Sequence, residues 1–181
     1  MEETAIKALQ DRTDAKLRYA AVHLHELNAM PSRRGDDFDR ADQESFLYHL
    51  LGVRDAFLVE LNAYYEGGLP GSGVTLGKLR EALERTNRSS PEVGELFTLE
   101  KDPESWLNQA KEMRDHSTHV AGVPRTFHAG GEDDGVVWLR NPRTNQPVER
   151  DFVLEFEAWH ASMGELIERL RTSSLRNTGR L

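Results

Sequence analysis

The chain has 181 residues, the usual size of one compact domain, so two full domains are not expected. Its 23 Lys and Arg residues against 31 Asp and Glu residues give a net charge of −8, which confines any nucleic-acid binding to a local cluster of cations. It contains no cysteine, which excludes disulfides, thiolate nucleophiles and cysteine-based zinc or iron–sulfur sites. No apolar stretch approaches a membrane span and the N-terminus is too polar for a signal peptide, so the sequence predicts a soluble, cytoplasmic protein.

Apolar residues recur at helical spacing in the first half of the chain. This spacing predicts a long helix over residues 3–30 and a second over residues 40–66. Pro, Gly and Asp at 31–37 separate the two helices, because these residues favour turns. A glycine-rich break at 67–73 precedes a short helix over residues 75–87.

Two more helical signals lie in the middle of the chain. A proline after two serines predicts a short turn of helix over residues 89–96. Asp102 followed by Pro103 supplies an N-cap and a proline in the first helical position, so a fourth helix is expected from there to residue 120.

The last third combines a hairpin with a final helix. Apolar runs at 136–139 and 148–153 flank an Asn- and Pro-rich turn, which indicates a β-hairpin. Aromatic and aliphatic residues at steps of four and three predict a last helix over 152–172, and residues 174–181 are expected to fray. The sequence therefore predicts a single all-α domain over residues 1–181, an antiparallel bundle of about five helices with a small β-hairpin inserted before the last helix.

The most polar and titratable segment of the fourth helix runs from Glu112 to His119. A rotation of about 100° per residue, starting at Trp106, assigns the core-facing side to Ala110, Met113, Ser117 and Val120. Asp115 and His119 then share the opposite face as i, i+4 neighbours, close enough for the carboxylate to hold the imidazole in one tautomer. Such a face is expected to meet solvent or a second subunit.

This segment resembles the signature of the HEPN family, the helical "higher eukaryotes and prokaryotes nucleotide-binding" domains, many of which are ribonucleases. That signature is an Arg, four to six residues and a His on a late helix of a bundle, with a polar residue directly after the Arg. Arg114 and His119 have four residues between them, and Asp115 is the polar follower. The residue two positions after the His is Ala121, where one toxin branch of the family has a Tyr.

The resemblance implies metal-independent cleavage of RNA in a cleft at the interface of a homodimer. It implies that His119 is the catalytic imidazole and Arg114 the phosphate-binding cation, with Asp115 as a third catalytic residue that orients His119. His116, Ser117 and Thr118 are the expected substrate-binding residues. No metal and no cofactor is expected, and the partners would be RNA, a second copy of the chain and a regulatory or antitoxin protein.

Three other interpretations stay open. The first is a solvated helix face with Asp115 as a simple surface partner. The second is a helical bundle without catalytic activity that binds a protein or RNA. The third is a metal-binding bundle built on His116, His119 and His160, although two imidazoles at i, i+3 without placed carboxylates make an incomplete site.

A second Arg and His pair has the same spacing on the first helix. Arg18 and His23 match, but the follower of the Arg is Tyr19 and the residues after it are apolar. This pair is therefore not the predicted site. His25, His49 and His128 stand alone in the sequence and are expected to be packing or surface residues.

Overall fold

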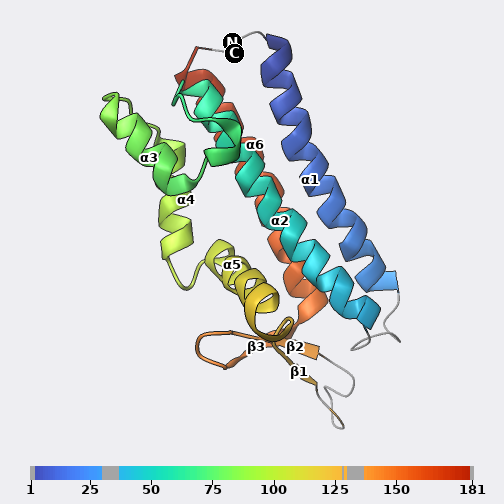
Figure 1. The fold of residues 1–181 in the computed structure, drawn as a ribbon. Coiled ribbons are helices and arrows are strands. Elements are labelled where there is room, and N and C mark those ends of the chain that lie inside the picture. Colours follow the sequence, from blue (N-terminus) through green and yellow to red (C-terminus); the bar gives the residue numbers. More distant parts are fainter. Residues whose placement is uncertain (1–2, 30–36, 128, 130–136, 180–181) are drawn as a thin grey trace.

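A computed structural model describes residues 3–29, 37–127, 129 and 137–179 of the chain. These residues form six α-helices and a small three-stranded antiparallel sheet that precedes the final helix (Figure 1). The prediction of a helical bundle with a small β insertion before its last helix is confirmed. None of the helices within these ranges is both long and apolar enough to cross a bilayer.

Three long helices lie side by side and form most of the core (Figure 1). They are α1 (Glu3–Ala29), α2 (Asp37–Tyr64) and α6 (Phe152–Asn177). Phe46 of α2 stacks on Phe156 of α6 with ring centroids 4.5 Å apart, and Trp159 packs against the same cluster. Because α2 is buried on several sides, it is the central helix, as its broad apolar pattern predicts.

Four short elements flank α2 on the side away from α1 (Figure 1). They are η2 (Gly71–Gly73), α3 (Leu76–Arg85), α4 (Pro91–Lys101) and α5 (Trp106–His116). The hydroxyl groups of Thr75, Ser90 and Ser105 accept hydrogen bonds from backbone N–H groups of the first turns of α3, α4 and α5. These caps satisfy donors that a helix start leaves without partners.

The middle of the chain differs from the prediction in two ways. The helical turn expected over 89–96 is a full helix, α4, which ends at Lys101. The fourth helix begins at Trp106 and not at Pro103, because the carboxylate of Asp102 accepts from the N–H of Glu104 and closes a turn before the helix. Ser105 is then the N-cap.

The sheet has the order β1–β2–β3 at one end of the bundle. Its strands are β1 (Arg125–Phe127), β2 (Val137–Arg140) and β3 (Pro147–Asp151). The predicted hairpin corresponds to β2 and β3, and its first residue, Val136, lies outside the described residues. Strand β1 was not predicted, since three residues carry too short a pattern. Arg125 forms a buried ion pair with Asp39 at 2.7 Å, which ties the sheet to α2.

The C-terminal end of α6 also differs from the prediction. Helix α6 continues to Asn177, beyond the expected boundary at 172, and Ser174 is fully buried with its hydroxyl on the carbonyl of Leu170. The tail expected to fray from residue 174 is therefore helical over its first four residues. Residue 30 of the first predicted helix and residues 31–36 of the predicted break lie outside the described part of the chain, as do residues 180–181.

Candidate functional site

The Arg114–His119 segment lies at the end of α5, beside α2 (Figure 1). The buried stripe of α5 runs through Leu107, Ala110 and Met113. Trp106 and Ser117, which the predicted core-facing side includes, are only half-buried. The buried side of α5 is therefore rotated from the predicted one. The side chain of Val120, also placed on the predicted side, lies outside the described part of the molecule.

The helix changes its hydrogen-bonding pattern within the motif. Helix α5 ends at His116, and Ser117–Ala121 form one turn of π-helix, η3, a turn that is wider than that of an α-helix. The wider turn breaks the i, i+4 relation on which the pairing of Asp115 with His119 was predicted. His119 lies exposed in the middle of this turn. Single π-turns of this kind occur frequently at functional sites.

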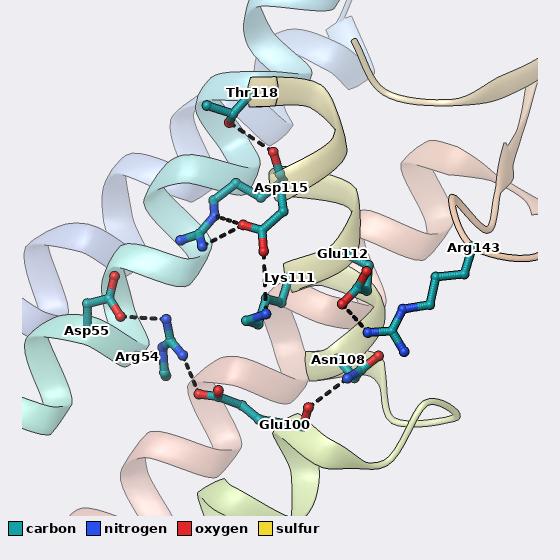
Figure 2. Close-up of polar contacts among 10 residues, drawn as sticks. Arg54, Asp55, Glu100, Asn108, Lys111, Glu112, Asp115, Thr118 and Arg143 are labelled. Carbon is teal, nitrogen blue, oxygen red and sulfur yellow. Dashed lines mark hydrogen bonds and ion pairs between the residues drawn. The ribbon is translucent and has the colours of Figure 1, made fainter. Parts of the chain in front are cut away.

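Asp115 binds cations of its own helix. Its Oδ1 accepts hydrogen bonds from Nε and Nη2 of Arg114 at 3.1 and 2.8 Å, and its Oδ2 lies 3.4 Å from Nζ of Lys111. Lys111 and Asp115 both point from α5 toward α2 (Figure 2). In the described part of the chain no hydrogen bond joins Asp115 to His119. Asp115 therefore positions Arg114, and not His119 as the sequence predicts.

The electrostatics of this cluster favour a charged carboxylate. Partial burial raises the pKa of Asp115, but the hydrogen bonds from Arg114 and the charges of Arg114 and Lys111 lower it by more. The net pKa lies below the ordinary value for an aspartate. Asp115 is thus ionised at neutral pH and holds the guanidinium of Arg114 in one place.

The two hydroxyl groups predicted to bind substrate are already engaged. Ser117 and Thr118 both donate to the backbone carbonyl of Arg114, each at 2.9 Å. These bonds satisfy an acceptor at the end of α5, where the regular ladder stops. Because a phosphate oxygen needs a donor, neither hydroxyl can serve it without giving up its bond to Arg114. His116 is half-exposed on the last turn of α5.

Arg114 also lines a groove of about 830 Å³ over the outer side of α2, called here the α2 groove. Helix α2 forms its floor, and α1 forms one wall through Arg12 and Lys16. Glu100 of α4 and Arg114 of α5 form the facing wall. Residues of η2 and of the first turn of α3 close one end, among them Gly71, Ser72, Thr75, Leu76 and Gly77.

The charged lining of the α2 groove is mostly cationic in a chain whose net charge is −8. Arg54, on the floor, is 10% exposed and is paired with Asp55 at 2.6 Å and with Glu100 (Figure 2). Burial lowers the pKa of Arg54, but the two carboxylates raise it by more, so the guanidinium stays charged and compensated. The two acids of the lining are therefore both used by Arg54.

The α1 wall carries two cations that form no ion pair with an acid in the described part of the chain. Arg12 and Lys16 lie one helical turn apart, and neither forms an ion pair with any described residue. Nζ of Lys16 lies 5.1 Å from the ring centroid of Tyr48, which also lines the groove. A phosphate in the α2 groove would thus meet two uncompensated cations on one wall and Arg114 on the other.

A family model matches residues 8–176 of the chain. The chain belongs to DUF6586, a family of unknown function. Comparisons of the chain with curated proteins and with solved structures found no match.

The histidines that the structure describes do not gather into a metal site. His160 bonds through Nε2 to the backbone carbonyl of Leu17 on α1, at 3.1 Å. The described residues hold no group of three His, Asp or Glu side chains that could ligate a metal ion. The cluster of His116, His119 and His160 considered from the sequence is therefore not formed among them. His23, of the second motif, instead bonds to Asp42 at 2.9 Å.

The sequence analysis missed the α1 wall and the floor of the groove. Arg12, Lys16, Tyr19 and His23 follow each other at steps of four, three and four, so they form one stripe of α1. That stripe was visible in the sequence as a polar and aromatic face. Its position opposite Arg114 depends on how α5 packs on α2, which the sequence does not show.

Proposed function

We propose that this protein, as a HEPN-like ribonuclease, binds RNA in the α2 groove and cleaves it without a metal ion at the adjoining end of α5, where His119 lies outside the lining of the groove. The observation that carries the proposal is that Arg114, the Arg of the Arg-x4-His segment, lines a groove whose opposite wall holds the uncompensated Arg12 and Lys16. Phosphate binding by Arg and Lys provides most of the affinity of proteins for nucleic acids. A local cluster of this kind is what a chain of net charge −8 needs for that purpose.

The proposed reaction uses the substrate's own 2′-hydroxyl as nucleophile. Its oxygen attacks the adjacent phosphorus and forms the 2′,3′-cyclic phosphate, while the bond from phosphorus to the 5′-oxygen of the next nucleotide breaks. The proton of the 2′-hydroxyl passes to an imidazole, and the leaving 5′-oxygen takes up a proton. His119 is the proton-transfer group, and Arg114, held by Asp115, stabilises the charge on the phosphoryl oxygens.

A homodimer would complete this site. His119 is exposed on η3, and each chain brings one such imidazole to a reaction that needs a base and an acid. An isologous interface places the same surface of two subunits face to face, so the second His119 would come from the partner. Light scattering should then give twice the mass of one chain, and a strict monomer with full activity would contradict the dimeric site.

The decisive experiment is a cleavage assay on mixed RNA in EDTA. His119→Ala should lower the cleavage rate by a factor of about 10²–10⁴, the usual contribution of a positioned acid–base group. Arg114→Ala should lose rate and RNA affinity together. The matched controls are Arg18→Ala and His25→Ala on α1, both exposed and outside the α2 groove, which should leave the rate unchanged.

The products give an independent check of the mechanism. The 5′ fragment should end in a 2′,3′-cyclic phosphate, and a 2′-deoxy sugar at the scissile position should block cleavage. Equal cleavage of DNA and RNA, or full activity of His119→Ala, would contradict the assigned roles.

A second candidate is RNA binding without cleavage. It is favoured by the exposed position of His119 and by the use of Asp115 for Arg114. In that case wild type binds RNA without cutting it in any buffer. Arg114→Ala then weakens binding, while His119→Ala has no effect.

A further inference from the structure

An aromatic cluster lies on the outer face of α1 and α2 and continues from the α2 groove. The ring of His49 lies edge-on to Tyr19 and Tyr48, with centroid distances of 5.4 and 5.3 Å. His23 stacks on His49 with the ring centroids 5.5 Å apart and the two rings nearly parallel. Tyr19 and Tyr48 are 50% and 62% exposed, so both phenol rings present much of their surface to solvent.

The histidine between the tyrosines is an uncharged ring. Burial, and then the charges of Lys16 and His23, lower the pKa of His49. Its ring is therefore neutral at pH 7 and does not repel a cation or attract a phosphate. The cluster offers aromatic rings at its edges, and Lys16 adds a cation on its groove side.

Lys16 joins this cluster to the groove. Its ammonium group lies over the ring of Tyr48, and its stem crosses α2 at Gly52, where an added Cβ would come within 3.3 Å of Cδ of Lys16. Arg12, Lys16 and Tyr19 lie on one stripe of α1, which rises roughly 10 Å from Arg12 to Tyr19. That rise corresponds to about three stacked bases at 3.4 Å each.

We propose that Tyr48 and Tyr19 form a base-stacking subsite for single-stranded RNA, with Lys16 and Arg12 on the phosphates that lead into the α2 groove. This inference rests on the proposed RNA-binding function. Single-strand sites combine aromatic rings for the bases with a cationic groove for the backbone, and both parts are contiguous here. A duplex would not use the tyrosines, because its bases are already stacked on each other.

The test is an affinity measurement by fluorescence anisotropy. One probe is a labelled 2′-O-methyl RNA of 12 nucleotides without self-complementarity, and the other is the duplex of the same strand. The methyl group prevents the 2′-oxygen from attacking the phosphate, so the probes are not cleaved. Tyr48→Ala should weaken single-strand binding about 5- to 140-fold and leave duplex binding unchanged. Tyr48→Phe should bind as wild type, because the ring is retained. Leu154→Ala, also exposed but on α6, is the matched control.

The cations have a separate readout. Lys16→Ala should lower the slope of log affinity against log salt concentration by about 0.7, the value for one phosphate contact on a single strand. Lys7→Ala, on the same helix and paired with Asp11 outside the groove, should leave the slope unchanged. An unchanged slope in Lys16→Ala would overturn the assigned phosphate contact.

The outcomes separate this inference from the proposed function. If wild type binds RNA and Tyr48→Ala binds it equally well, the subsite is wrong while the proposed function stands. If Tyr48→Ala weakens binding but His119→Ala cleaves at full rate, the subsite stands and the catalytic role fails. If the tyrosine variants leave RNA affinity unchanged but lower the mass seen by light scattering, the rings belong to a protein interface and the inference is overturned.

Discussion

Two charged clusters of this molecule are built in opposite ways. Inside the bundle, Glu60 is fully buried and accepts hydrogen bonds from Tyr64 at 2.8 Å and from Nε and Nη2 of Arg171 at 2.9 Å. Arg171 also reaches Asp14, so α1, α2 and α6 all contribute to this interior cluster. On the outer side of α2, Arg12 and Lys16 have no acidic partner among the described residues.

The difference indicates which charges serve the fold and which are available to a ligand. A buried charge without partners is costly, so the interior cluster must be satisfied by the chain itself. Cations at the edge of an open groove are solvated, and they can exchange water for a phosphate. The interior cluster should therefore control stability, and the α2 groove should control RNA affinity.

The largest expected effect is on stability, from Arg171→Ala. Loss of the guanidinium leaves the carboxylate of Glu60 buried without its cation, which should lower the free energy of unfolding by about 3–5 kcal/mol. Urea denaturation followed by circular dichroism measures this change. Arg176→Ala, exposed on the same helix, should change it by less than ~0.5 kcal/mol. If both variants lowered the free energy of unfolding equally, the interior cluster would not be what stabilises the fold.

Arg114→Ala should produce the next largest effect, on binding. Hydrogen bonds to a charged group are worth about 1.5–3 kcal/mol, so RNA affinity should fall roughly 10- to 150-fold. Stability should change little, since the side chain of Arg114 is partly exposed and, among the described residues, its guanidinium bonds only to the neighbouring Asp115. Anisotropy and urea denaturation on the same protein sample test both statements. If Arg114→Ala lowers the free energy of unfolding but keeps its affinity for RNA, Arg114 serves the fold, as the interior cluster does, and not RNA binding.

Gly122→Ala tests the end of the π-turn that carries His119. Gly122 has φ +58° and ψ −179°, a conformation that only glycine adopts without strain, and no atom of the described residues outside its chain neighbours lies within 4 Å of an added Cβ. The cost should therefore come from the backbone alone and be on the order of 1–3 kcal/mol. Gly94→Ala, within α4 and equally open, should instead be neutral or stabilising. Similar thermal shifts for both variants would contradict this explanation.

The smallest effect concerns pH and His49. Because the folded chain lowers the pKa of His49, the unfolded chain binds more protons below about pH 6.5. Stability should thus decrease as the pH falls through that value, and His49→Phe should flatten this part of the profile. Urea denaturation between pH 5 and pH 8 measures the slope, with His25→Phe as the exposed control. A steeper dependence of stability on pH in His49→Phe would contradict a lowered pKa of His49 in the folded chain.

The helices could be predicted from the sequence because apolar spacing and hydroxyl caps are local signals. The start of α5 was misplaced for a local reason as well, since Asp102 and Ser105 are both good caps and only the observed turn selects Ser105. The face of Asp115 could not be predicted, because a continuous α-helix through Val120 was assumed where η3 widens the turn. The α2 groove depends on the packing of α1, α2 and α5, which no single segment encodes.

The most direct test of the central claim, that RNA lies in the α2 groove against Arg114, is photocrosslinking. RNA that carries 4-thiouridine is irradiated with the wild-type protein, and the crosslinked peptides are identified by mass spectrometry. The crosslinks should fall on peptides that contain residues 12–19 of α1, residues 48–55 of α2 and Arg114 of α5, and Arg114→Ala should reduce them. Crosslinks confined to the exposed side of α6, unaffected by Arg114→Ala, would contradict the claim.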